Sequence, residues 1–445
     1  MNLSTRSFCL ALACGLWSGP ALVIQSQTYT FTTIAGSPGV NGTNDGVNVE
    51  ARFYCPSEIA VDQAGVVYVC DFLNHAIRKV DPTSGQWQVS TIAGLPGTPG
   101  AVDGTNSEAR FNRPCGIEVD GQGNLYVTDL YNHLVRKIAP VGADWVVTTL
   151  AGAAGLRGTN NGLGTDARFW SPRGMARDQS GGLYVADSAT HIIRKISPEG
   201  TNWVVTTPVG EYPYYGFVDE TNEWAEFNTP FSICAHPDGT LFVSEWGNHA
   251  IRQITRYGGD WVTRTVAGTG DPGNEDGSGS EASFNFPAGL DVDAGHTVYV
   301  SDQSNHTVRR LLREGNGWIV STIAGLAGER GSIDGVGTEA RFNKPWGVAV
   351  DSVGNLYIAD YQNHTIRMGI LQGVTPPVLH IVLAAGEIVL SWPSTATDYV
   401  LETGTSLEPG GTWEPITEGI LVSGDSFVAS RATTAVTALF RLRRQ

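Results

Sequence analysis

Short apolar stretches with many β-branched residues follow one another along most of the chain, separated by turn residues. Gly116–Val119 and Leu125–Val127 are one such pair, with a turn between them. Stretches of this length predict β-strands, and helix-forming runs are scarce. The 55 glycines of the chain suit the many turns that such strands require. The pattern therefore predicts an all-β protein.

The predicted strands belong to a unit that recurs six times. Each copy contains a segment similar to Thr-Ile-Ala-Gly, whose glycine stands at residues 36, 94, 152, 210, 268 and 325, a spacing of 57 or 58 residues. An Ala-Arg-Phe-like segment follows, then a proline, an apolar strand, a turn and a second strand. Such self-similarity at a fixed period is typical of repeat architectures. Each unit predicts four strands, A to D from the centre outwards.

The two ends of the repeat region predict how the fold closes. Strand D carries a tryptophan in five copies, and the equivalent residue ahead of the first copy is Tyr29. The last copy stops at its third strand, near Ile370. We therefore expect Tyr29–Ile34 to be the outer strand of the last unit, which removes the unpaired edges of an open array. The tryptophans are Trp87, Trp145, Trp203, Trp261 and Trp318.

An acid, a histidine and an arginine recur around the start of strand C. Strand B ends in the acid, the histidine follows four residues later, and the arginine comes three residues after it. Because strands lie about 4.8 Å apart, the histidines should form a ring too wide to share one ion, whose bonds to nitrogen are about 2 Å. We expect each histidine to bridge back to the acid, and each arginine to form an ion pair. The histidines are His75, His133, His191, His249, His306 and His364.

Two strings of the second copy, Asn124–Asp129 (NLYVTD) and Asn132–Ile138 (NHLVRKI), resemble the NHL repeat. The added Thr-Ile-Ala-Gly and Ala-Arg-Phe segments resemble the NHL propeller of teneurins and their bacterial relatives. The resemblance covers about Tyr29–Ile370 and implies a six-bladed β-propeller, which we assign to residues 28–372. It does not imply one function, because the family includes adhesion and recognition modules, sensors and a few lyases.

The pattern changes after Thr375-Pro376-Pro377. Residues 376–445 resemble the small β-sandwich modules, fibronectin-type-III- or Ig-like, at the C-termini of secreted bacterial proteins. Such a module is more often a spacer or attachment unit than a catalyst. Its strands are expected at Val378–Leu383, Glu387–Trp392, Tyr399–Thr403, Trp413–Ile416, Phe427–Ser430 and Leu439–Arg443.

The net charge and the N-terminal segment indicate which partners and which cellular compartment to expect. The formal net charge is −16, which disfavours nucleic acid and anionic membranes as partners. Residues 1–27 are interpreted as a signal peptide, with a positive charge within Met1–Arg6 and an apolar stretch, Phe8–Ile24, that glycine and proline interrupt. No later segment is long and apolar enough to cross a bilayer. We expect a secreted, periplasmic or cell-surface monomer.

Four cysteines follow this segment: Cys55, Cys70, Cys115 and Cys234. They lack the C-x-x-C spacing of many metal sites. An oxidising compartment permits a disulfide, and Cys55 and Cys115 stand at nearly equivalent places in adjacent copies, so they are the best candidate pair. Four buried free thiols are the alternative.

The sequence gives little support to a metal or catalytic site. The non-repeated histidines His236, His296 and His380 are not three axial ligands, and we assign no metal ligands. No Ser/His/Asp arrangement or paired-carboxylate site is visible. Acidic pairs recur in the D–A loops, where calcium is an alternative to ordinary acidic turns, and we expect no cofactor. The pairs are Asp45/Glu50, Asp103/Glu108, Asp276/Glu281 and Asp334/Glu339.

Candidate binding residues are sought where the repeat is broken. The D–A and B–C loops emerge on one face of a propeller, and the aromatic and cationic residues that vary there suit a binding surface. Packing against neighbouring loops is the alternative role for each residue. The candidates are Phe72, Tyr131, Trp170, Arg173, Tyr214, Trp246, Trp346 and Tyr361.

These expectations describe an exported, non-catalytic recognition or adhesion module. It would bind protein or carbohydrate through the loop-rich face, because aromatic platforms suit sugar rings and peptide side chains equally. The alternative is a propeller-type lyase or lactonase that uses a divalent metal near the central axis.

Overall fold

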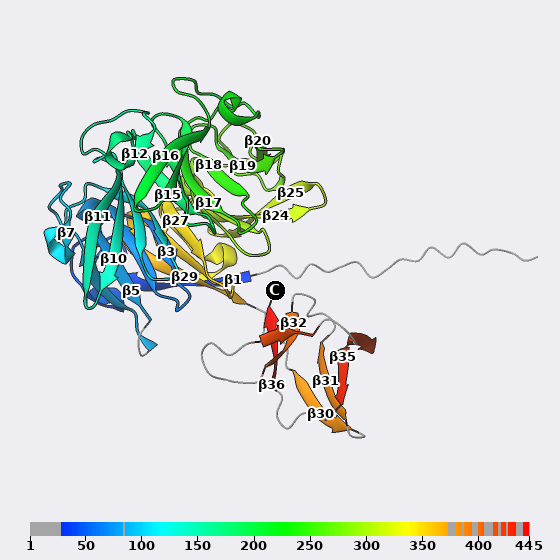
Figure 1. Ribbon diagram of the computed structural model, residues 1–445. Helices are drawn as coiled ribbons and strands as arrows, with labels where there is room; N and C mark the ends of the chain where they lie inside the picture. The colour runs from blue at the N-terminus through cyan, green and yellow to red at the C-terminus, as the bar shows by residue number, and fades with distance from the viewer. Residues whose placement is uncertain are drawn as a thin grey trace, which may run out of the picture.

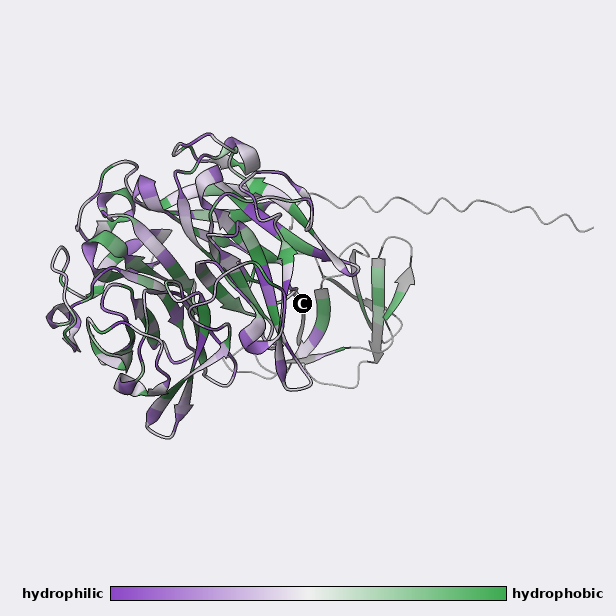
Figure 2. Ribbon diagram, turned by 90° about the horizontal axis from the view of Figure 1, so that it is seen from above, coloured by the Kyte–Doolittle hydropathy of each residue, from purple (hydrophilic) through white to green (hydrophobic). Residues whose placement is uncertain are grey.

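The computed structural model describes residues 28–82 and 85–372, and seven segments of the C-terminal region: 379–384, 387–393, 399–404, 413–416, 420–423, 426–432 and 439–444. These residues form antiparallel sheets joined by loops and short 3-10 turns (Figure 1), with apolar positions along the strands (Figure 2). The all-β prediction is confirmed. The predicted signal peptide, residues 1–27, lies outside the described residues. In the described part of the chain, no helix has the length and apolarity to span a membrane.

Six sheets between residues 28 and 372 repeat one design. In the first sheet, strands A to D are β3 (Pro56–Val61), β4 (Val67–Asp71), β5 (Ala76–Asp81) and β6 (Gln88–Ala93). The A strands contact one another in a cycle that returns to β3, so the arrangement is propeller-like. The other A strands are β8 (Pro114–Val119), β13 (Pro172–Arg177), β17 (Pro230–Ala235), β22 (Pro287–Val292) and β27 (Pro345–Val350).

The outer strands of the other sheets follow the same order. Strand B is β9 (Leu125–Asp129), β14 (Leu183–Asp187), β18 (Leu241–Glu245), β23 (Val298–Asp302) and β28 (Leu356–Asp360). Strand C is β10 (Leu134–Val141), β15 (Ile192–Glu199), β19 (Ala250–Tyr257), β24 (Thr307–Glu314) and β29 (Thr365–Gln372). Strand D is β11 (Asp144–Gly152), β16 (Asn202–Val209), β20 (Asp260–Ala267), β25 (Gly317–Ala324) and β1 (Thr28–Gly36).

Five sheets carry a short fifth strand from the D–A loop, which the four-strand prediction missed. The fourth sheet has no such strand among its described residues and makes one bridge instead, Thr221 to Val262. At the start of the short strand, the other five copies have glycine, and the backbone there passes close to the residues that follow. The fourth copy has Glu220 at this position. The short strands are β2 (Gly46–Val47), β7 (Gly104–Thr105), β12 (Gly162–Leu163), β21 (Gly277–Ser278) and β26 (Gly335–Val336).

The first described strand completes the last sheet. β1 pairs antiparallel with β29, with Tyr29 opposite Leu371 and Phe31 opposite Gly369. This confirms the prediction that Tyr29–Ile34 is the outer strand of the last unit.

Aromatic contacts between neighbouring sheets also run in a closed cycle. The strand D tryptophan of one sheet packs against the strand B aromatic residue of the sheet before it, with ring centroids about 6 Å apart and steep interplanar angles that favour edge contacts. Tyr29 takes the tryptophan's place in the last sheet. The pairs are Tyr68–Trp145, Tyr126–Trp203, Tyr184–Trp261, Phe242–Trp318, Tyr299–Tyr29 and Tyr357–Trp87.

Each repeated arginine is buried and ties its own sheet to the preceding D–A loop, which confirms the ion-pair expectation. Arg78 lies 2.7 Å from Asp71 at the end of strand B and 2.8 Å from Asp45 in the loop. It also donates to the carbonyl of Asn44 at 2.9 Å and lies over the ring of Phe53. Calcium was an alternative for the acidic pairs of the D–A loops. The first acid of each pair, however, has an arginine guanidinium as its partner: Asp45, Asp103, Asp276 and Asp334.

The predicted partner of the repeated histidines is wrong. Each histidine Nδ1 accepts a hydrogen bond from a backbone N–H of the next sheet's D–A loop; Arg113 donates to His75 at 3.0 Å, and Cys55 to His364 at 3.1 Å. Asp71 instead accepts from Arg78 and Asn74. Burial lowers the pKa of all six histidines, which keeps the imidazole neutral and Nδ1 free to accept. The histidines therefore link sheets, again in a closed cycle.

The described C-terminal segments form two further sheets. One has the order β30 (His380–Ala384), β31 (Glu387–Pro393), β35 (Ser426–Ala432), β34 (Ile420–Ser423). The other has the order β33 (Trp413–Pro415), β32 (Tyr399–Gly404), β36 (Leu439–Arg444). Leu390 and Trp392 of the first and Leu401 of the second share one apolar cluster. The predicted strands are confirmed, and β34 is additional.

Candidate functional site

Aromatic residues gather at the loop-rich end of the A strands, the end at which these strands begin. The second position of strand A supplies Phe231 and Trp346, and the first residue after strand B supplies Phe72, Trp246 and Tyr361. These five residues come from three sheets, and the cyclic order of the A strands brings them together. We call these five residues the aromatic cluster.

Ring contacts run through the whole aromatic cluster. The centroid of Trp346 lies 4.6 Å from that of Tyr361, 5.1 Å from that of Phe231 and 5.5 Å from that of Phe72. Trp246 stacks on Phe231 at 6.0 Å. Phe72 and Trp346 are only 6% and 7% exposed, whereas Trp246 and Tyr361 are half-buried. The first two form the floor, and the last two are accessible to a partner.

Polar groups are built into this apolar setting. The Arg173 guanidinium lies 4.6 Å above the ring of Phe231, a cation–π geometry. Among the described residues, the indole Nε1 atoms of Trp246 and Trp346 and the Nε of Arg173 are buried without a hydrogen-bond partner. Buried donors normally find a partner, so these three are exceptions; the Nε of Arg173 shares this state with the Nε of the six repeated arginines.

The remaining candidates lie around or away from the aromatic cluster. Tyr131 is half exposed and accepts a hydrogen bond from Arg113 at 2.7 Å, and Arg113 also lies over Phe72. Trp170 packs under Arg157, and Tyr214 is 61% exposed. Five of the eight predicted residues therefore meet, Tyr131 borders them, and Trp170 and Tyr214 do not join the cluster.

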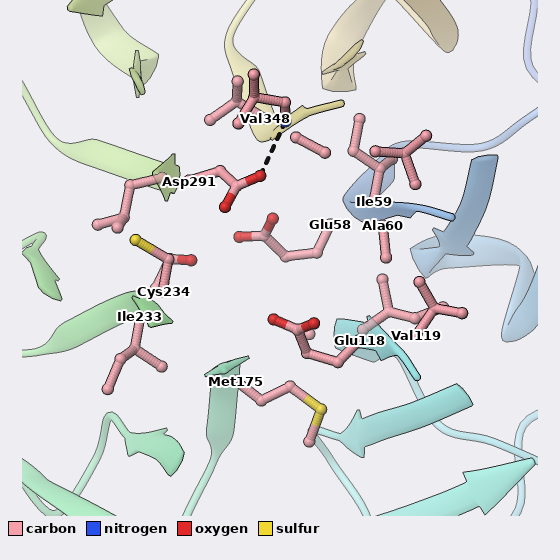
Figure 3. A pocket seen from close by; sticks show the side chains of 17 residues that line it. Glu58, Ile59, Ala60, Glu118, Val119, Met175, Ile233, Cys234, Asp291 and Val348 are labelled. Carbon is pink, nitrogen blue, oxygen red and sulfur yellow. Dashed lines mark hydrogen bonds between the residues drawn. The ribbon is translucent and has the colours of Figure 1, made fainter. Parts of the chain in front are cut away.

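Three carboxylates converge on the axis below the aromatic cluster, which the sequence reading missed. Glu58 is the third residue of its A strand, and Glu118 and Asp291 are the fifth residues of theirs; their side chains point toward one another (Figure 3). They line a cavity of about 120 Å³. Asp291 accepts backbone hydrogen bonds from Val292 and Val350, each at 2.8 Å. The statement that no paired-carboxylate site exists is thus wrong.

Burial controls the ionisation of these acids. It raises the pKa of Glu58 to about 8 and that of Asp291 to about 6, and it raises the pKa of Glu118 although Arg177 opposes the shift. One Glu58 carboxylate oxygen has no partner among the described residues. The cavity has room for a few waters or one ion, and is smaller than the roughly 300–1,000 Å³ of small-molecule pockets.

The thiols form no disulfide. Cys55, Cys70, Cys115 and Cys234, the cysteines of the described residues, are all free and buried. Burial raises the pKa of Cys55 to about 11 and that of Cys115 to about 12, so both stay protonated and unreactive. The alternative of buried free thiols is therefore confirmed, and the Cys55–Cys115 pairing is not formed.

Comparison with known proteins identifies the class of repeat. The NHL repeat family model matches residues 53–80, 284–311 and 342–367. The chain is 28% identical over 374 residues to NHL repeat-containing protein 2 of Bos taurus, covering 75% of this chain and 49% of that protein. It is 24% identical over 366 residues to teneurin-3 of Mus musculus, covering 74% of this chain and 13% of that protein. The chain thus carries NHL repeats and spans about half the length of NHL repeat-containing protein 2.

Solved structures support the fold. An auxiliary nutrient binding protein from Bacteroides ovatus superposes with a TM-score of 0.57 at 20% identity, covering 78% of each chain. A protein of unknown function from Bacteroides thetaiotaomicron superposes with a TM-score of 0.59 at 21% identity, covering 78% of this chain and 77% of that one. At this identity the likeness describes the fold alone.

Proposed function

We propose that this protein is an exported, non-catalytic recognition module that binds a protein or carbohydrate ligand at the loop-rich end of its axis. Six sheets would be the blades of one closed propeller spanning residues 28–372. The C-terminal sheets would form a small β-sandwich, residues 376–445, that spaces or attaches it. The N-terminal 27 residues would direct export, and the propeller would act as a monomer.

The observation that carries this proposal is the convergence of Trp246, Tyr361 and Arg173 on one place from three sheets. Two half-buried rings offer flat apolar faces, and the half-buried guanidinium of Arg173 beside them offers donors. Sugar rings and peptide side chains both use this combination of stacking and hydrogen bonding. The floor residues Phe72 and Trp346 pack against Tyr361, and Phe231 packs against Trp246.

The comparisons agree with a binding role. One superposable structure is described as an auxiliary nutrient binding protein. Teneurin-3 and NHL repeat-containing protein 2 share the repeat over three quarters of this chain. None of these proteins fixes the ligand, so the aromatic cluster carries the argument.

An array of glycans and of extracellular proteins, probed with the full chain, tests the proposal. Every ligand found should be probed again with the Trp246→Ala/Tyr361→Ala double variant, whose circular dichroism should match that of the unchanged protein. The proposal predicts loss of the signal, because both accessible rings are removed. Undiminished binding by the folded double variant would overturn it.

The alternative, a propeller-type lyase or lactonase with an axial metal, has one observation in its favour. Glu58, Glu118 and Asp291 offer oxygen ligands around one cavity. The cavity admits an ion and water, but its volume leaves no place for a substrate beside them. We therefore rank this alternative second; stoichiometric metal removed together with an activity would reverse the order.

A further inference from the structure

Two neighbouring A–B turns bring together side chains whose chemistry the binding proposal does not use. His236 and Asp238 lie in the turn after β17, and His296 lies in the turn before β23. The nitrogen and oxygen ligand atoms of the three side chains all lie within 4.8 Å of one another. The sequence predicts no metal ligands, and these histidines do not lie on the axis.

Both histidines face the same carboxylate. His236 Nδ1 lies 2.9 Å from one oxygen of Asp238, and His296 Nε2 lies 2.9 Å from the other. The two imidazole centroids are 3.4 Å apart. Two ligands on one tetrahedral ion, with bonds of about 2.0–2.1 Å, lie about 3.3 Å apart. Small rotations of these side chains would therefore place all three ligand atoms around one ion.

The hydrogen bonds around His236 prepare Nδ1 as a ligand. Its Nε2 lies 3.4 Å from the carbonyl oxygen of Ala294, and the backbone N–H of Asp238 points at Nδ1 from 3.3 Å. A proton on Nε2 satisfies both contacts and leaves a lone pair on Nδ1. The same lone pair lies 2.9 Å from a carboxylate oxygen of Asp238, so a cation bound between these two atoms would replace the long 3.3 Å contact from the backbone N–H. Such an outer carbonyl partner is usual for metal-bound histidine.

Two of the three residues, His236 and His296, are also departures from the repeat, whereas the position of Asp238 varies among the copies. The other five A–B turns have aspartate at the position of His236; Asp120, for example, caps its turn by accepting from Gln122 and Asn124. The other five have glycine at the position of His296, which adopts a φ of +63°. A side chain is disfavoured at this φ. Both turns therefore lose their favoured residue, and the replacements meet at one point.

We propose that His236, Asp238 and His296 form a binding site for a divalent transition-metal ion, Zn²⁺ first, that links the fourth and fifth sheets. Two imidazoles and a carboxylate suit Zn²⁺ and related ions. His236 is 8% exposed, whereas His296 and Asp238 are 32% and 48% exposed. The site is thus anchored on one side and open on the other, where water completes the coordination.

Metal titration of the full chain, purified without an affinity histidine tag, tests this proposal. Zn²⁺ should bind with one-to-one stoichiometry and raise the melting temperature, and Co²⁺ at the same site should give a visible absorption band. The key variant is His296→Gly, which restores the residue of the other five turns and so should fold. It should weaken Zn²⁺ binding by about 100-fold or more, because even outer partners of a ligand matter by roughly 10–100-fold.

The matched control is Glu199→Gln, which removes an exposed acid from another sheet. It should leave Zn²⁺ affinity and the Co²⁺ spectrum unchanged. Asp238→Ala places the residue of the first turn, Ala64, at this position and should also lose the site. The absence of stoichiometric binding by the unchanged chain, or equal affinity of the unchanged chain and His296→Gly, would refute the site.

Discussion

The two ends of the axis around which the A strands are arranged carry different chemistry on the same repeated frame. At the loop-rich end, the second residues of the A strands and the residues after the B strands build the aromatic cluster. A few residues further along the axis, Glu58, Glu118 and Asp291, which belong to three other A strands, surround a small cavity. The frame around both, made of repeated arginines and histidines, is the same in every sheet. The difference indicates that the repeat supplies the scaffold and that single departures supply the chemistry.

The largest expected effect comes from breaking the frame. Arg136→Ala leaves Asp129 buried without its cation and removes the donors to the preceding loop, so we expect a loss of about 3–5 kcal/mol of unfolding free energy. Urea denaturation followed by tryptophan fluorescence measures it. Arg110→Ala, which removes an arginine bonded only to nearby carbonyls, should cost about 1 kcal/mol and serves as the control. Equal effects of the two variants would contradict the role given to the buried arginine.

The axial carboxylates should give the protein a pH-dependent stability. The folded-state pKa of Glu58, about 8, is above its ordinary value of 4.5. The stabilisation from this group is therefore complete below pH 4.5 and is lost as the pH rises towards 8, a change on the order of 5 kcal/mol. Glu58→Gln should reduce this slope in unfolding free energies measured between pH 5 and 9, and the slope that remains should come from Glu118 and Asp291, whose pKa values are also raised. An unchanged slope would show that Glu58 ionises freely.

The histidine links should have a moderate effect with the opposite pH sign. His133→Ala removes the acceptor for the N–H of Ser171, so we expect a loss of about 1–3 kcal/mol and a lower melting temperature. Ligand binding per folded molecule should be unchanged. His133→Asn should recover part of the loss, because asparagine tolerates the positive φ of 59° and carries an acceptor. A melting temperature of His133→Ala equal to that of the unchanged protein would count against the link.

The lowered histidine pKa values fix the direction of the pH effect. These groups are neutral in the folded state and ionise more readily once unfolded. Their stabilisation is complete above the unfolded pKa of 6.5 and is lost as the pH falls through the folded value. Compared with the unchanged protein, His133→Ala should show a smaller loss of stability between pH 7 and 5. This slope is opposite to that expected from Glu58.

Much of the fold could be predicted because the same strand pattern recurs in six copies, so an assignment that is uncertain in one copy is supported by the others. The period located strands A to D of each copy, and Tyr29 in place of the tryptophan identified the closing strand. The partner of the histidines could not be predicted, because their link crosses from one sheet to the next and depends on a left-handed turn at the histidine. The same-copy acid was nearer in sequence but was already paired with arginine.

The site was predicted in part for a related reason. Trp346 beside the strand A proline, and Trp246 and Tyr361 after strand B, could be predicted as candidates because aromatic residues stand out as departures from the repeat. Glu58, which replaces a small residue, and Glu118, which replaces an apolar one, are departures too, but only the cyclic packing of the A strands brings them together. His296 and Asp238 stand 58 positions apart in turns of adjacent copies, so their contact depends on how neighbouring sheets pack.

The most direct test compares the two ends of the axis with one ligand. For each array ligand, the dissociation constant should be measured by calorimetry for Trp246→Ala and for Glu58→Gln, both verified as folded. The account predicts about tenfold or greater weakening for Trp246→Ala, since a buried aromatic contact contributes more than about 1 kcal/mol, and no change for Glu58→Gln. Weakening by Glu58→Gln with full affinity in Trp246→Ala would place recognition at the cavity and contradict the account.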